Sequence, residues 1–140
     1  MIRAVLDANV LISGALAAGR PDSLMGQIIR SWEHRQFELV CSEPLIEEVA
    51  RNLTSLRFSN RLNADDVEAF IRLLRQESEM VGITGRIQGT ASHPEDDRIL
   101  ETALSSGANY LVTGDKQLLA LAHIEDVVIV GARDFLEAVR

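Results

Sequence analysis

The sequence contains a single cysteine and lacks any long apolar segment. Cys41 has no second cysteine to pair with, so no internal disulfide bond can form, and we expect a protein of the reducing cytoplasm. No apolar run approaches the roughly 20 residues that span a bilayer, which excludes a membrane-spanning helix. The opening residues, MIRAVLDANV, include an acidic residue at position 7. They predict a buried strand rather than a secretory signal.

The chain also lacks the basic character that most nucleic-acid-binding proteins show. Its net charge is -7 and its pI is about 4.9. Two interpretations follow. Either the protein does not bind nucleic acid, or much of its negative charge is gathered where a divalent cation neutralises it. The motifs have to decide between these two.

No repeat, low-complexity tract or linker divides the sequence. Its 140 residues, 46% of them hydrophobic and 25% charged, suit an ordinary globular fold with a real hydrophobic core. We therefore expect a single domain over residues 1–140.

Short apolar segments alternate with segments of helical periodicity. Strands are expected at Ile2–Leu6, Phe37–Cys41, Tyr110–Thr113 and Val127–Val130, with shorter extended pieces at Met80–Ile83 and Arg86–Ile87. Helices are expected over residues 8–18, 24–32, 44–53, 64–74, 95–106, 116–122 and 131–139. Nearly all-apolar strands that alternate with helices indicate a parallel sheet covered on both faces. The predicted fold class is α/β.

Two aspartates follow predicted strands directly. Asp7 comes after Ile2–Leu6, and Asp115 follows Tyr110–Thr113 by one glycine. In open parallel sheets, ligands bind beyond the carboxyl ends of the strands, so both residues are candidates for a site. An aspartate in this place can also simply cap the next helix.

Helical phase separates the acidic residues near the start of the helix expected over 95–106. At about 100° per residue, Asp96 falls near the centre of the stripe formed by Leu100, Ala103 and Leu104, and Asp97 falls on its rim. Glu101 lies farther out. An inward-pointing carboxylate needs a partner, which a structural arginine or a metal ion could supply.

Glu47 and Glu48 are less informative. Both lie outside the apolar stripe of the helix expected over 44–53, and periodicity barely separates them. Taken alone, each is typical of a solvated surface charge.

Four segments together resemble the PIN domain, in that family's order. They are LDANVLIS (Leu6–Ser13), SEPLIEEV (Ser42–Val49), PEDDRILETAL (Pro94–Leu104) and NYLVTGDKQLL (Asn109–Leu119). The resemblance is strongest to the VapC-like branch, the toxin components of toxin–antitoxin systems. It implies an acidic site of Asp7, Glu48, Asp96 and Asp115. It also implies supporting roles for Asn9, Thr113 and Glu101.

The sequence departs from this pattern modestly. Ala8 stands where the family often has threonine, and His93 stands where this branch often has aspartate. Neither change affects the four acids.

Carboxylates without histidine or cysteine form an all-oxygen site, which suits Mg²⁺ and also Mn²⁺. The metal ligands expected are Asp7, Asp96 and Asp115, and Glu48 would bind metal directly or hold a water. The three histidines fall in separate segments, so a zinc site is not expected. Candidate cations for guiding a substrate are Arg20, Arg57, Arg61, Arg98 and Lys116, although each is also typical of a solvated surface residue.

These observations favour a metal-dependent endoribonuclease. The resemblance implies an RNA substrate, a cognate antitoxin and a homodimer. A housekeeping RNA-processing nuclease and a non-catalytic PIN scaffold are the alternatives within the family. A haloacid-dehalogenase-like domain usually has a second aspartate where Asn9 stands, and a receiver domain needs an acidic pair and a late lysine that are not evident.

Overall fold

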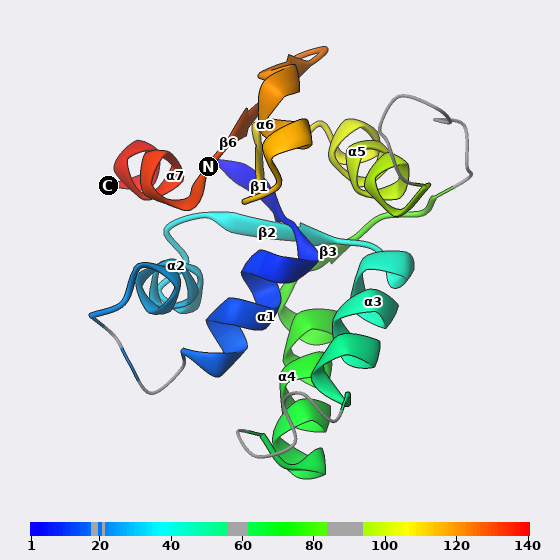
Figure 1. Ribbon diagram of the computed structural model, residues 1–140. Helices are drawn as coiled ribbons and strands as arrows, with labels where there is room; N and C mark the ends of the chain where they lie inside the picture. The colour runs from blue at the N-terminus through cyan, green and yellow to red at the C-terminus, as the bar shows by residue number, and fades with distance from the viewer. Residues whose placement is uncertain (18–19, 21, 56–61, 84–93) are drawn as a thin grey trace.

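The computed structural model describes residues 1–17, 20, 22–55, 62–83 and 94–140 (Figure 1). These residues form a sheet with the strand order β3-β2-β1-β4-β6-β5. The strands are β1 (Arg3–Leu6), β2 (Glu38–Cys41), β3 (Glu79–Met80), β4 (Tyr110–Val112), β5 (His123–Ile124) and β6 (Val127–Val130). All neighbouring strands are parallel except β5, which pairs antiparallel with β6.

The helices follow the periodicity of the sequence closely. They are α1 (Ala8–Leu16), α2 (Leu24–Glu33), α3 (Glu43–Leu53), α4 (Ala64–Glu77), α5 (Pro94–Ser106), α6 (Lys116–Leu121) and α7 (Ala132–Val139). Polar residues fix several starts: Ser23 accepts a hydrogen bond from the Gly26 N–H, and Asn63 forms a capping box with Asp66. Within the described chain, no helix has both the length and the apolar character needed to cross a membrane.

The predicted α/β class and parallel sheet are confirmed. Ala4, Val5 and Leu6 of β1 are consecutive and fully buried, so both faces of this strand are covered. Figure 1 shows α5 on one side of the central strands and α1 on the other. The antiparallel strand β5 was not predicted, and the expected piece at Arg86–Ile87 lies outside the described residues.

The order of the strands creates a switch point between β1 and β4. From β1 the chain builds β2 and β3 on one side, and then crosses to build β4, β6 and β5 on the other. Leu6 pairs with Val112, and the ladder continues with a hydrogen bond of 2.9 Å from the Asp7 N–H to the Val112 carbonyl. Ligand sites in open α/β sheets lie at such a point, beyond the carboxyl ends of the strands.

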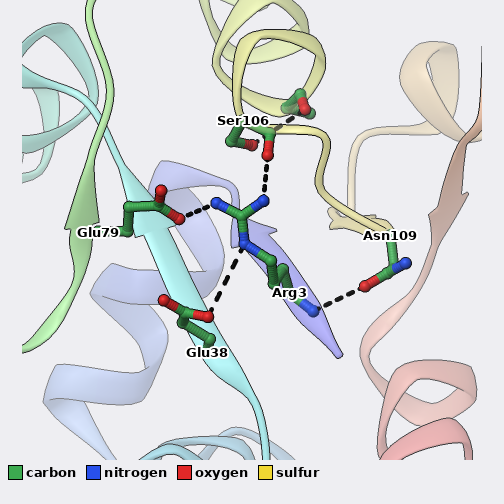
Figure 2. A network of polar contacts seen from close by, with 6 residues as sticks. Arg3, Glu38, Glu79, Ser106 and Asn109 are labelled. Carbon is green, nitrogen blue, oxygen red and sulfur yellow. Dashed lines mark hydrogen bonds and ion pairs between the residues drawn. The ribbon is translucent and has the colours of Figure 1, made fainter. Parts of the chain in front are cut away.

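The opposite, amino-terminal edge of the sheet is joined by Arg3 (Figure 2). Its guanidinium binds the Glu79 carboxylate and the Ser106 carbonyl, and its Nε lies 3.8 Å from Glu38. Its backbone N–H donates a hydrogen bond of 2.8 Å to Asn109 Oδ1. These partners belong to β2, β3, the end of α5 and the residue before β4. Arg3 therefore connects four segments at the edge remote from the switch point.

Candidate active site

Asp7 is held firmly at the switch point. It is 9% exposed, directly follows β1 and caps α1. Its Oδ1 accepts a hydrogen bond of 2.7 Å from the Ala8 N–H, and its Oδ2 accepts one of 2.7 Å from the Thr113 hydroxyl. Both carboxylate oxygens therefore have a donor, and the side chain has a fixed orientation.

Thr113 also links Asp115 to Asp7 by a hydrogen bond. The Thr113 oxygen accepts a hydrogen bond of 3.0 Å from the Asp115 N–H. Asp115 Oδ1 accepts hydrogen bonds from the N–H groups of Gln117 and Leu118, at 2.7 and 3.2 Å. Asp115 therefore does cap α6, as the simpler interpretation of the sequence holds, and it also stands beside a buried carboxylate.

The environment of Asp7 disfavours its negative charge. Burial raises the pKa of Asp7 above its ordinary value, the hydrogen bonds from Thr113 and Ala8 lower it, and the charge of Asp115 raises it again. A divalent cation between these carboxylates would offset both the desolvation and the repulsion. The oxygen-only donor set at this point fits Mg²⁺ or Mn²⁺.

The structure separates Glu48 from its neighbour, which the sequence pattern could not do. Glu48 is half-buried on α3 and Glu47 is exposed. Helix α3 packs against α1, α4 and α5, and both glutamates line a hollow between α3 and α5. This difference in burial depends on how α3 packs against its neighbours, which local periodicity does not reveal.

The expected burial along α5 is wrong. Asp97 is 7% exposed and Glu101 only 1%, whereas Asp96 is half-buried. The phase argument assumed a helix with one buried stripe, but α5 contacts β1, β2 and β4 as well as α3. A helix that is covered on several sides buries residues outside any single stripe. Burial therefore does not select Asp96 over Asp97.

The predicted site residues are not all brought to one point. Thr113 is buried beside Asp7, and Asn9 is exposed near the start of α1. No three of the histidine, cysteine and acidic side chains that the structure describes are grouped so that they could hold a metal ion. Glu48, Asp96, Asp97 and Glu101 each take part in polar or electrostatic interactions. Of the candidate cations, Arg57 and Arg61 lie outside the described residues.

Sequence reasoning missed a pair of buried hydroxyls beside α5. Ser42 and Thr102 are fully buried, and their oxygens are 2.9 Å apart. Because the Thr102 hydroxyl donates to the Arg98 carbonyl at 2.8 Å, the Ser42 hydroxyl donates to Thr102. The available signal was Ser42 itself, a polar residue directly after a buried strand, as Asp7 is.

A model of the PIN domain matches residues 3–117. The chain belongs to the PIN domain family. The predicted family is therefore confirmed, and the matched range includes all four predicted acids. PIN domains are generally nucleases and generally use divalent metals.

A solved structure agrees with this assignment at the level of the fold. The chain is similar to the structure described as VapBC2 from Rickettsia felis bound to a DNA fragment from their promoter. The TM-score is 0.58 at 14% identity, and the match covers 93% of this chain and 98% of that chain. At this identity the likeness establishes a shared fold. None of the curated proteins matches the chain.

Proposed function

We propose that this PIN domain is a metal-dependent endoribonuclease. The observation that carries the proposal is the Asp7 carboxylate, which is buried at the switch point, fixed by Thr113 and destabilised by the charge of Asp115. A fold seldom keeps a carboxylate in such a place without a compensating charge. Under this proposal the four acids are Asp7, Glu48, Asp96 and Asp115.

In this proposal Asp7, Asp96 and Asp115 hold Mg²⁺ or Mn²⁺, and Glu48 binds the metal or holds a water molecule. When bound, the cation supplies Lewis acidity at a phosphodiester and lowers the pKa of a water molecule. Thr113 positions Asp7, because it donates to one of that residue's carboxylate oxygens. Asn9 and Glu101 support the site. No side chain acts as a covalent nucleophile.

The biological setting in this proposal is that of a toxin. The structurally similar VapBC2 is a complex bound to promoter DNA. The resemblance of the sequence segments supports a toxin held inactive by an antitoxin protein, acting in the cytoplasm on RNA as a single-domain homodimer. Arrest of growth when the chain is expressed alone, relieved by Asp7→Asn, is the expected outcome. Normal growth would favour a housekeeping RNA-processing enzyme.

Cleavage of RNA in the presence of Mg²⁺ or Mn²⁺ tests the chemistry directly. We expect Asp7→Asn to lower the rate by at least about 100-fold, because removing a metal ligand removes several kcal/mol of transition-state stabilisation. Asp126→Asn makes the same change of charge at an exposed turn and serves as the matched control. Equal activity in both variants would overturn the site. Undiminished cleavage in a chelator would overturn the role of metal.

A further inference from the structure

The arginines that the structure describes fall into two groups. Four of them lie within 3.8 Å of a glutamate carboxylate, namely Arg3, Arg35, Arg72 and Arg75. The others form no ion pair with any residue that the structure describes, although the chain as a whole carries an excess of acids, and Arg51 and Arg98 are among them. Both side chains are exposed.

These two arginines share a hollow between α3 and α5. Its charged wall residues are Glu48 of the proposed acidic site, the neighbouring Glu47, Arg51 and Arg98. The buried Ser42–Thr102 hydroxyl pair also lines it. Arg51 follows Glu48 by three positions and so lies about one helical turn farther along α3. Arg98 follows Asp96 by two positions at the start of α5. The hollow therefore places two cations beside Glu48.

We infer that this hollow binds a backbone phosphate of single-stranded RNA, next to the phosphodiester that is cleaved. The inference rests on the proposed function, because it gives the same site its substrate contacts. A guanidinium presents several donors in a plane and matches the oxygens of a phosphate. A phosphate gains little binding free energy from a cation that is already paired with a carboxylate. Arg51 and Arg98 have no such carboxylate partner among the residues that the structure describes.

The arrangement also resolves the conflict between an acidic protein and an anionic substrate. Sequence-independent affinity for nucleic acid comes mainly from contacts between cations and phosphates. On α4, Arg72 and Arg75 are paired with Glu68 and Glu43, so that surface offers RNA little. A local pair of available arginines can hold a strand at the acidic site while the net charge of the chain stays negative.

The test measures binding rather than cleavage. A fluorescent single-stranded RNA is titrated with Asp7→Asn protein over a range of salt concentrations, so that strand hydrolysis does not interfere. Arg51→Gln and Arg98→Gln are introduced together into this Asp7→Asn protein. Arg30→Gln and Arg133→Gln are added together in the control, since these exposed arginines on α2 and α7 give the same change of charge.

Losing two phosphate contacts should weaken binding roughly tenfold at low salt and reduce the salt slope of the affinity by about 0.7 for each arginine. The control pair should change the affinity less than about twofold, through long-range charge alone. Equal weakening and equal slopes in the two proteins would overturn the inference. In proteins that retain Asp7, the Arg51 and Arg98 changes should raise KM more than they lower kcat.

The two proposals can fail separately. If the wild-type protein does not cleave RNA but the Arg51 and Arg98 changes still weaken binding selectively, the proposed function fails and the phosphate site stands. If cleavage is observed and binding is unchanged by these substitutions, only the phosphate site fails.

Discussion

The Thr113 hydroxyl donates a hydrogen bond of 2.7 Å to Asp7 Oδ2 and accepts one of 3.0 Å from the Asp115 N–H. It thus joins the ends of two neighbouring parallel strands that are far apart in sequence. One side chain sets the relative positions of the two aspartates that the sequence places at strand ends.

Thr113→Val removes this hydroxyl with little change of shape. We expect the free energy of unfolding to fall by about 1–3 kcal/mol, because a buried carboxylate and a backbone N–H each lose a partner. The pKa of Asp7 should rise further, since the hydrogen bond from Thr113 lowers it. Urea denaturation measures the stability. Thr113→Ser, which keeps the hydroxyl, should recover most of the loss, and a valine variant as stable as the wild type would contradict the expected role.

Asp96→Asn and Asp97→Asn should separate catalysis from stability. Asp97 is buried and engaged in polar or electrostatic interactions, so its change should cost about 1–3 kcal/mol of folding free energy. Asp96 is only half-buried, so Asp96→Asn should cost less folding free energy. Under the proposed function it should abolish cleavage. Thermal unfolding and RNA cleavage are measured on the same preparations. Cleavage that survives Asp96→Asn and fails with a folded Asp97→Asn protein would move the ligand to Asp97.

Arg3→Met should destabilise the fold and leave cleavage intact. Arg3 binds Glu79 and the Ser106 carbonyl at the edge of the sheet remote from Asp7, so its loss should cost about 1–3 kcal/mol, less in high salt. Arg72→Met breaks an exposed pair with Glu68 within one helix and should cost less than about 0.5 kcal/mol. The comparison is made by urea denaturation. Equal costs would show that the Arg3 contacts add nothing beyond an ordinary surface pair.

Cys41 should make stability depend on pH in the alkaline range. Burial raises the pKa of its thiol to about 11, against 9.0 for a solvent-exposed thiol, and the hydrogen bond with Ser78 lowers it in part. Because the folded pKa is raised, the contribution of the neutral thiol is complete below pH 9 and is lost as the pH rises toward 11. Relative to Cys41→Ala, the wild type should lose up to about 3 kcal/mol across this window. A constant difference between the two proteins would contradict the raised pKa.

The central strands and the strand-end acids could be predicted from the sequence. Val127–Val130 was predicted with its observed bounds, and β1 and β2 were each predicted one residue too long. These strands are nearly all apolar, so local composition marks them. Asp7 and Asp115 follow such strands. They lie close together because the two strands, β1 and β4, pair in parallel. Gly107, with φ of +66°, ends α5 as expected.

The remainder depends on contacts between segments distant in sequence. Strand β5 has two residues, too few to form a pattern, and it exists because it pairs with β6. Glu48 differs from Glu47 only through the packing of α3 against its neighbours. The burial of Asp97 and Glu101 arises because α5 is covered by the sheet and by α3 together. A periodicity argument that assumes one buried stripe cannot describe a helix that packs against two neighbours.

The described sheet ends in a two-residue strand at each edge, β3 on one side and β5 on the other. Strands this short leave few backbone N–H and C=O groups for another chain to pair with. Extension of the sheet from one molecule into the next is therefore disfavoured. Copies of this protein, or a partner, should associate through side-chain surfaces such as the helices, and such contacts can be tuned by substitution without disturbing the strands.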